Sequence, residues 1–307
     1  MMFGTREEFS YFECRTCGCV QMETIPEDVS GFYGASYYAH QPQASATPST
    51  ALARARRKFR HQLTRLELRY PRLAQKTLRL LRRESALPYW VAPMADRLRL
   101  NSRILDVGCG AGAILFDLQT AGFSDLTGID PFIPASVEAA GVRLLKRDLF
   151  SVTETFDCVM LHHAFEHMDD PHRVFAKLAE TISDTGVIVL RTPVAGTFAW
   201  RTYGKNWVQL DPPRHLFVHT RESMRLLADA AGLRIRATVF DSTNFQFWAS
   251  EQYLRDMPLE HPQSLMHNLP YGSFSVAEVE QFNRDAERLN REEDADQAAF
   301  YLERAPR

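Results

Sequence analysis

The sequence predicts an α/β protein with a doubly wound, mostly parallel sheet and a helical extension at the N-terminus. From residue 101 onward, short apolar runs alternate with stretches of helical periodicity, which is typical of βαβ units. The runs are almost continuously apolar, as strands are when helices cover both faces of a sheet. A glycine-rich turn directly follows the first run, where doubly wound folds bind their ligands.

Length and composition exclude several other classes of protein. The chain has 307 residues, 45% apolar and 24% charged, with a formal net charge of −2, which excludes disordered proteins and disulfide-stapled miniproteins. No run reaches the roughly 18 apolar residues of a transmembrane helix. The N-terminal sequence MMFGTREEFSYFEC lacks the apolar core of a signal peptide. Because three of the five cysteines crowd together as Cys14, Cys17 and Cys19, we expect a reducing, cytoplasmic location.

The chain divides into three expected parts. Residues 1–40 form a cysteine-containing head, residues 41–100 a linker and a basic helical arm, and residues 101–307 the main domain. In the arm, residues 51–83 hold twelve Lys and Arg against a single acid. Apolar residues recur there at helical spacing, and Pro71 predicts a kink or a break in the helix.

The main domain contains seven strand-like runs and four helical stretches. The predicted strands are 103–107, 125–129, 142–145, 156–161, 186–191, 233–241 and 297–303. The predicted helices are 111–121, 134–140, 171–182 and 220–232. A long, aromatic-rich insert separates the last two strands.

The clearest motif is ILDVGCGAG at 104–112, in which a strand runs into a glycine-rich turn and then a helix. Glycine permits a tight turn and a close approach to a ligand, and the helix N-terminus offers free N–H groups. Asp130 ends the next strand, at the place where an acid accepts hydrogen bonds from a ribose diol. Asp148 follows the third strand in the same way. These acidic strand ends predict a nucleoside site.

Two features bear on which nucleoside binds. The third glycine of a dinucleotide fingerprint is replaced by Ala113, which some dinucleotide sites tolerate. Asp106 suits a ligand with positive charge better than a pyrophosphate. The sequence also lacks a set of residues for hydride transfer, so a nicotinamide oxidoreductase is disfavoured.

With these motifs, the sequence resembles the class I S-adenosylmethionine-dependent methyltransferases over residues 101–307. The resemblance rests on the turn at 104–112, on GID ending in Asp130, on RDLF with Asp148, and on FDCVMLHHAFEHMDDP at 156–171. It implies a seven-stranded sheet whose last strand, 297–303, is antiparallel. It also implies S-adenosylmethionine as cofactor and S-adenosylhomocysteine as product. In such a protein the turn contacts the methionine portion, Asp130 the ribose and Asp148 the adenine. The full set of expected cofactor residues is Asp106, Gly108, Cys109, Gly110, Gly112, Asp130, Pro131, Asp148, Leu149 and His162.

The segment HHAFEH at 162–167 should lie at the carboxyl edge of the sheet and supplies candidate catalytic residues. Methyl transfer is an in-line displacement, and it needs a general base only when the acceptor arrives protonated. His163 is a candidate base and would share a face with His167 if the segment is helical. The resemblance adds the pair Glu166 and His167, residues that some ubiquinone-pathway relatives link to a divalent metal. In the alternative, Glu166 caps or orients the backbone and His167 only packs against a helix. We expect no bound metal at this segment.

Residues 196–219 form a long, aromatic-rich segment that predicts a lid or a binding element. Its DPPRHLF run resembles a stretch that borders the acceptor pocket in bacterial small-molecule methyltransferases. His215 is therefore the second candidate base. In the alternative, Pro212 and Pro213 fix a turn and His215 bonds to backbone.

The cysteine head resembles the second half of a zinc ribbon, FECRTCGCV at 12–20. A structural zinc site needs four ligands, and no second CxxC knuckle precedes these cysteines. His40 has no motif to support it as the fourth ligand, so bound zinc is not expected. Cys109 and Cys158 are expected to be ordinary buried thiols.

The function that the sequence predicts is methyl transfer to a small-molecule acceptor, such as a sugar or a secondary metabolite. One alternative is an RNA methyltransferase that recruits its substrate through the basic arm at 51–83, and another is a non-catalytic module that binds the cofactor. Nucleic acid is disfavoured because the arm has no RNA-binding signature. The positive charge of the arm is explained by a solvated face that forms salt bridges to the acidic main domain. A second interpretation of this charge is contact with an anionic membrane or a lipid-linked acceptor.

Overall fold

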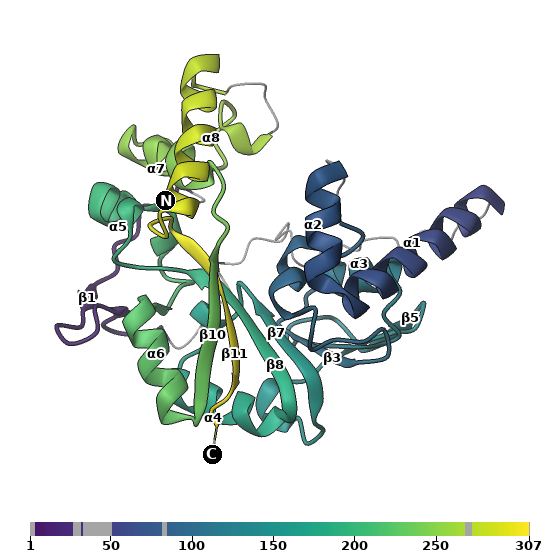
Figure 1. Ribbon diagram of the computed structural model, residues 1–307. Coiled ribbons are helices and arrows are strands. Elements are labelled where there is room, and N and C mark those ends of the chain that lie inside the picture. Colours follow the sequence, from purple (N-terminus) through teal and green to yellow (C-terminus); the bar gives the residue numbers. More distant parts are fainter. Residues whose placement is uncertain (1–3, 27–31, 33–50, 82–84, 268–271, 307) are drawn as a thin grey trace.

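A computed structural model describes residues 4–26, 32, 51–81, 85–267 and 272–306. The predicted linker at 41–50 and His40 lie outside these residues. The core is an eight-stranded sheet (Figure 1) in the order β10-β11-β8-β7-β3-β4-β6-β5. Its strands are β3 (Arg103–Val107), β4 (Asp125–Ile129), β5 (Val137–Ala139), β6 (Val142–Leu145), β7 (Phe156–His162), β8 (Ile182–Pro193), β10 (Leu233–Phe240) and β11 (Gln297–Arg304).

The strand pairing confirms the doubly wound fold. Strand β3 pairs in parallel with β4 and β7, β4 with β6, and β7 with β8. Strand β11 lies between β8 and β10 and is antiparallel to both, as predicted for the last strand.

The helix predicted at 134–140 is wrong, and strand β5 takes its place as an eighth strand. Ala139 pairs with Val142, so Ala140 and Gly141 form a two-residue hairpin loop. Both have a positive φ, of 54° and 81°, which a type I′ hairpin turn requires. The short apolar run before this turn fits a strand as well as it fits a helical turn.

Strand β7 explains why the predicted strands are apolar throughout. Its alternate residues Val159 and Leu161 are buried in the core on one face of the sheet, and Cys158 and Met160 in the core on the other. Both faces are covered by helices, so a strand with alternating polarity would bury polar groups there.

The helices predicted from periodicity form largely where expected. The main-domain helices are α3 (Ala113–Ala121), α4 (Pro171–Thr181), α5 (Phe198–Tyr203), α6 (Arg221–Ala230), α7 (Phe245–Leu254) and α8 (Val276–Arg291). Short 3-10 helices are η3 (Tyr89–Met94), η4 (Leu149–Ser151), η5 (Phe165–His167), η6 (Gly204–Asn206), η7 (Val208–Leu210) and η8 (Leu265–His267). Helices α7 and α8 come from the aromatic-rich insert and form a lobe at the top of Figure 1.

The basic arm consists of two helices, α1 (Ala51–Arg69) and α2 (Pro71–Leu81). The break falls at Pro71, as predicted, because proline has no N–H and its ring clashes with the preceding turn. Leu68 of α1 is buried in the same core as Leu115 and Leu118 of α3, so the arm is anchored to the main domain.

The cysteine head folds as a hairpin of β1 (Tyr11–Glu13) and β2 (Val20–Met22). Strand β2 also pairs with β9 (Phe217–Val218), which gives a separate three-stranded sheet. The head is therefore joined to the segment that contains His215. No helix of the described chain is both long and apolar enough to cross a membrane.

Candidate active site at the carboxyl edge of the sheet

The expected cofactor residues gather where the parallel strands end. Asp106 lies in β3, Asp130 directly follows β4, Asp148 follows β6, and His162 ends β7. Because β3, β4, β6 and β7 are parallel, these positions lie at one edge of the sheet.

The turn after β3 needs glycine for steric reasons. Gly108 and Gly112 have φ values of 75° and 80°, in the left-handed region. A Cβ on Gly108 would lie only 2.6 Å from the Cβ of Ala164. Ala164 belongs to the HHAFEH segment, so the cofactor turn and the candidate reacting segment are in direct contact.

Asp130 braces the glycine turn from the next strand. Its Oδ2 accepts a hydrogen bond from the Gly110 N–H at 3.0 Å, and its Oδ1 accepts one from the Phe132 N–H at 2.8 Å. Each carboxylate oxygen has a second lone pair, so ribose hydroxyls can still bind. Pro131, next to it, is exposed.

Asp106 is a buried carboxyl beside this turn, with 2% of its surface exposed. Burial, and then the negative charge of Asp130, raise the pKa of Asp106 to about 8. A positively charged ligand, such as one that carries a sulfonium, would favour the ionised form of Asp106.

Asp148 and Leu149 are the residues expected on the adenine side. Asp148 caps η4 by accepting a hydrogen bond from the Ser151 N–H at 2.8 Å, and Leu149 is buried beneath it. His162 packs edge-on against Trp90 at 4.9 Å, and burial lowers the pKa of His162 to about 3. The contacts of these residues with a cofactor stay a prediction.

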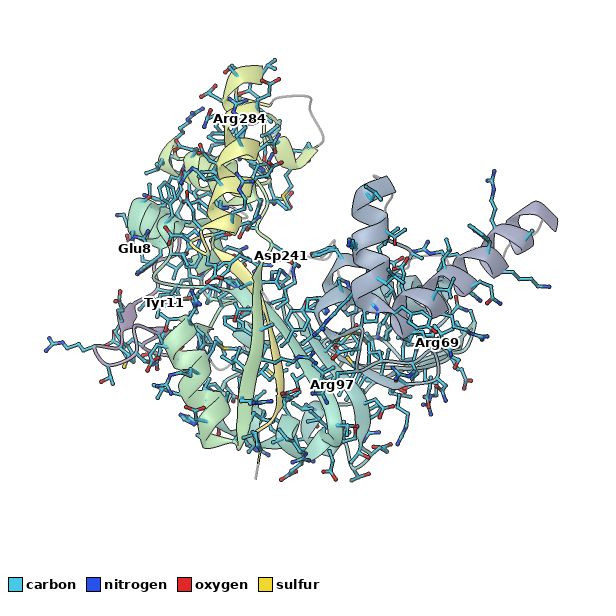
Figure 2. All side chains as sticks on the ribbon, viewed as in Figure 1. Glu8, Tyr11, Arg69, Arg97, Asp241 and Arg284 are labelled. Atoms are coloured by element: carbon cyan, nitrogen blue, oxygen red, sulfur yellow. The ribbon has the colours of Figure 1, made fainter. Side chains whose placement is uncertain are left out.

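His163 has both ring nitrogens engaged by protein groups. Its Nε2 lies 2.9 Å from the Arg191 guanidinium, which can only donate, so Nε2 accepts. Its Nδ1 then carries the proton and donates to Glu166 Oε1 at 3.2 Å. Arg191 is held in turn by Asp241, whose Oδ2 lies 2.7 Å from the Arg191 Nε. Figure 2 shows Asp241 at the end of β10, below the lobe of α7 and α8.

Glu166 is fully buried and kept as a carboxylate. Its Oε2 accepts a hydrogen bond from the Thr192 hydroxyl at 3.1 Å. Burial favours the protonated acid, but the hydrogen bond from His163 and the nearby histidines outweigh it, so the pKa of Glu166 falls to about 2.

His167 and His215 pack against each other, with ring centroids 4.9 Å apart. The Nδ1 of His167 lies 2.8 Å from the carbonyl oxygen of Arg214, and that of His215 lies 2.7 Å from the carbonyl oxygen of Gln209. A carbonyl only accepts, so each Nδ1 donates and each Nε2 carries a lone pair. Burial lowers the pKa of both histidines to about 4, so both are neutral at pH 7.

One ligand atom from each of Glu166, His167 and His215 lies within 4.8 Å of the other two. The Nδ1 contacts to backbone carbonyls resemble the way metal-binding histidines are oriented. Two imidazoles and one carboxylate suit a divalent transition metal, so these residues fit such an ion. His163 and His167 do not pair, because only η5 is helical in this segment and His167 faces His215 instead.

The DPPRHLF loop is held by its own charges and by the head. Arg214 forms a buried salt bridge with Asp211. The Tyr11 hydroxyl of β1 donates to the carbonyl oxygen of His215 at 2.8 Å. Sequence reasoning missed Tyr11, Thr192, Arg191 and Asp241. The last two could have been noticed, since Arg191 ends the run 186–191 and Asp241 ends 233–241.

A zinc ribbon is not confirmed in the head. Cys14 and Cys17 are partly buried and Cys19 is buried, with its Sγ 3.6 Å from His219 Nδ1. Burial raises the pKa of the Cys19 thiol to about 12, which favours the protonated form. Among residues 4–26 and the rest of the described chain, these cysteines do not join a cluster of three metal-ligand atoms.

Comparisons with known proteins give one matching family and several similar solved structures. Residues 67–238 match the family described as a methyltransferase domain. A cyclopropane synthase from Mycobacterium tuberculosis is 16% identical, with 71% of this chain and 84% of that chain covered and a TM-score of 0.45. An S-adenosylmethionine-dependent methyltransferase from Mesorhizobium loti is 16% identical, with 70% and 97% covered and a TM-score of 0.44. No curated protein matches the sequence.

Proposed function

The chain belongs to the class I S-adenosylmethionine-dependent methyltransferases, and we propose that it methylates a small-molecule acceptor at the carboxyl edge of the sheet. The observation that carries this proposal is the contact between Gly108 and Ala164. A Cβ added to Gly108 would lie 2.6 Å from the Cβ of Ala164. It brings the cofactor turn against the segment with His163 and Glu166. A bound methyl group and a reacting acceptor would therefore meet beside one cluster of acid and histidine side chains.

On the cofactor side, Gly108, Gly110 and Gly112 let the backbone approach the methionine portion. Asp130 accepts from the ribose hydroxyls while it fixes the turn. Asp106 loses its proton as the sulfonium enters, because the positive charge stabilises its carboxylate. The cofactor residues then act by position and charge, which is what an in-line displacement needs.

On the acceptor side, the base is the Nε2 of His215, with His167 beside it. As the acceptor oxygen or nitrogen attacks the methyl carbon, the carbon–sulfur bond breaks and S-adenosylhomocysteine leaves. The acceptor proton passes to Nε2, and the carboxylate of Glu166 stabilises the imidazolium. His163 is a positioning residue here, because Arg191 and Glu166 hold both of its ring nitrogens.

Glu166, His167 and His215 would hold a divalent cation if one binds. Such an ion would lower the pKa of an acceptor hydroxyl.

Glu166 and His215 are buried, which favours a small acceptor over a polymer. An RNA acceptor recruited by the arm is less well supported. The basic side chains of α1 lie beside residues 99–101 and 122–124, before β3 and β4 begin, which is the opposite edge of the sheet.

Calorimetric titration with S-adenosylhomocysteine, NAD and NADP tests the cofactor. We expect the first alone to bind, and Asp130→Asn to weaken its binding, because the amide has one acceptor oxygen left for Gly110, Phe132 and the ribose and points its NH2 group at another donor. Binding of NAD instead would overturn the proposal.

The acceptor class is tested with methyl-labelled cofactor and cell extract that has been separated into metabolites and RNA. Label in the metabolite fraction, strongly reduced in His215→Asn, is expected. Label in the RNA fraction alone would favour the RNA methyltransferase. Cofactor binding without any label transfer would favour a non-catalytic module.

A further inference from the structure

Helix α1 carries a second apolar face, opposite the face that packs on the main domain. Thr64 and Leu68 are buried against that domain. Phe59, Leu63, Leu66 and Tyr70 are instead exposed, by 63%, 38%, 54% and 48%. Their spacing of four, three and four residues places them in one stripe along the helix. We call these four residues the exposed stripe.

Cations lie on both sides of the exposed stripe. At about 100° of rotation per residue, Lys58, Arg65 and Arg69 lie on one side of it, and Arg56 and Arg60 on the other. Among the described side chains of α1, the cations Arg56, Lys58, Arg60, Arg65 and Arg69 form no salt bridge with the main domain. The fold therefore pairs none of these five described cations with an acid.

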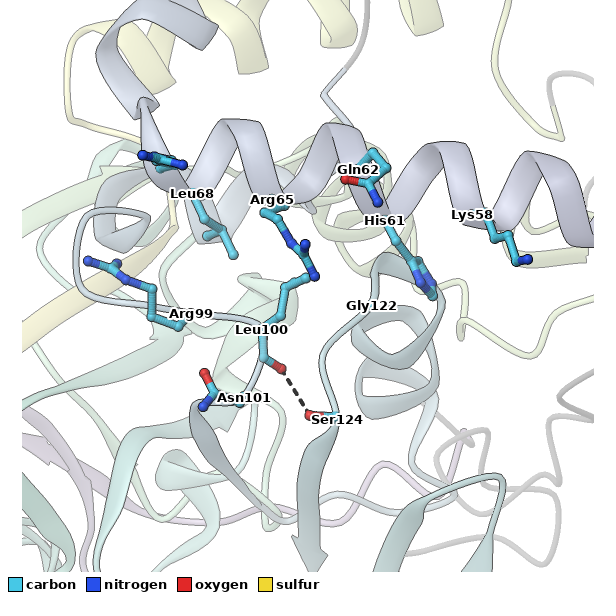
Figure 3. A pocket seen from close by; sticks show the side chains of 11 residues that line it. Lys58, His61, Gln62, Arg65, Leu68, Arg99, Leu100, Asn101, Gly122 and Ser124 are labelled. Carbon is cyan, nitrogen blue, oxygen red and sulfur yellow. Dashed lines mark hydrogen bonds between the residues drawn. The ribbon is translucent and has the colours of Figure 1, made fainter.

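A basic cavity of about 920 Å³ lies between α1 and the main domain, next to the side of α1 that carries Lys58, Arg65 and Arg69 (Figure 3). Its cationic lining is Lys58, Arg65 and Arg69 from α1, and Arg99 from the loop before β3. The rest of the lining includes Asn101 and Ser124 but no acid. Such a lining favours the binding of phosphate groups.

We propose that α1 lies on an anionic lipid bilayer. The exposed stripe enters the boundary between headgroups and acyl chains, and the flanking cations and the basic cavity bind headgroup phosphates. A helix with large apolar residues on one side and Lys and Arg beside them has the composition of an interfacial helix. This proposal does not depend on the acceptor or on catalysis.

Charge and composition favour a bilayer over other partners. RNA would use the cations, and its bases can stack on Phe59 and Tyr70, but it would leave Leu63 and Leu66 exposed. A second copy of α1 would cover the stripe but would bring two strongly positive helices together. An anionic bilayer satisfies both the apolar and the cationic residues.

Flotation of the full-length protein with lipid vesicles tests the proposal. We expect binding to vesicles of phosphatidylcholine with one quarter phosphatidylglycerol, little binding to pure phosphatidylcholine, and weaker binding at 0.5 M than at 0.1 M salt. Lys58→Gln with Arg65→Gln should weaken partitioning about 25-fold, since each cation contributes about a factor of five. Phe59→Gln with Leu66→Gln should weaken it at least about tenfold.

Matched variants separate this surface from general effects. Arg284→Gln with Arg291→Gln removes the same charge from exposed positions of α8, and Leu254→Gln removes an exposed leucine from α7. Both should bind vesicles as the unaltered protein does, and thermal melts should show that all variants fold. Equal binding to neutral and anionic vesicles, or no binding at all, would overturn the proposal. A third result would also overturn it. In this result the protein does not bind vesicles but binds RNA in a salt-sensitive way, and Phe59→Gln with Leu66→Gln does not change the RNA binding.

Discussion

Gly108 can carry no side chain for two separate reasons, its backbone conformation and its contact with Ala164. A left-handed φ costs an L-residue about 1–2 kcal/mol, and a Cβ would press on Ala164 at 2.6 Å. We expect Gly108→Ala to bind S-adenosylhomocysteine at least tenfold more weakly, measured by calorimetry. Gly141→Ala is the matched control, because its φ is 81° but no atom lies within 4 Å of its would-be Cβ. Equal binding by both variants would show that the Ala164 contact does not matter.

His215 and His167 make stability depend on pH below neutrality. Burial lowers the pKa of each from 6.5 to about 4, so the unfolded chain takes up protons before the folded chain does. Stability is therefore complete above pH 6.5 and falls as the pH drops towards 4, by about 2 kcal/mol per histidine at pH 5.

Urea unfolding at pH 7.5 and pH 5 measures this difference. In His215→Asn, whose amide can still donate to Gln209, the loss on acidification should be smaller by about 2 kcal/mol. His172→Asn, at an exposed position, should lose as much stability as the unaltered protein. A loss of the same size in all three proteins would contradict the assignment of neutral, buried histidines.

At the scale of elements, the head hairpin acts on the candidate site through Tyr11. Its hydroxyl bonds to the carbonyl oxygen of His215 at 2.8 Å. Tyr11→Phe should lower the free energy of unfolding by about 1 kcal/mol and speed hydrogen exchange in residues 209–219. Tyr70→Phe removes an exposed hydroxyl from the arm and should change neither. Unchanged exchange in Tyr11→Phe would mean that β2 and β9 alone hold the loop.

Elements whose pattern is local could be predicted from the sequence. Strand β7 is apolar on both faces and ends at a histidine cluster, so its place in the sheet and its role followed from neighbouring residues. Strand β5 could not be recognised, because the turn at Ala140 carries no asparagine or second glycine and its three residues fit either structure. The expected division at residues 40 and 100 stays a prediction.

The candidate site was partly predictable for the same reason. Asp130 and the glycines are marked by their places after strands, but the tautomer of His163 depends on Arg191, which is distant in sequence. The pairing of His167 with His215 likewise depends on a loop that returns to the sheet, so no local pattern revealed it.

At the scale of the whole molecule, the basic side chains of α1 and the cofactor turn lie at opposite edges of the sheet. We therefore expect Phe59→Gln with Leu66→Gln to leave cofactor binding intact. S-adenosylhomocysteine at 100 times its Kd should stabilise this variant and the unaltered protein equally, by about 2.7 kcal/mol. Ligand-dependent thermal melts measure this. A smaller shift in the variant would show that α1 and the cofactor turn are coupled.

The position of β11 has a consequence for synthesis on the ribosome. Strands β8 and β10 do not pair with each other, because β11 lies between them and pairs with both. Strand β11 is synthesised only after α5 to α8 have been translated. The nascent chain must carry two open β-edges through that interval, while β3, β4, β6 and β7 are already free to assemble. Chaperone contact during translation should therefore concentrate on β8 and β10, and the half of the molecule that carries the proposed cofactor residues can form before the other half closes.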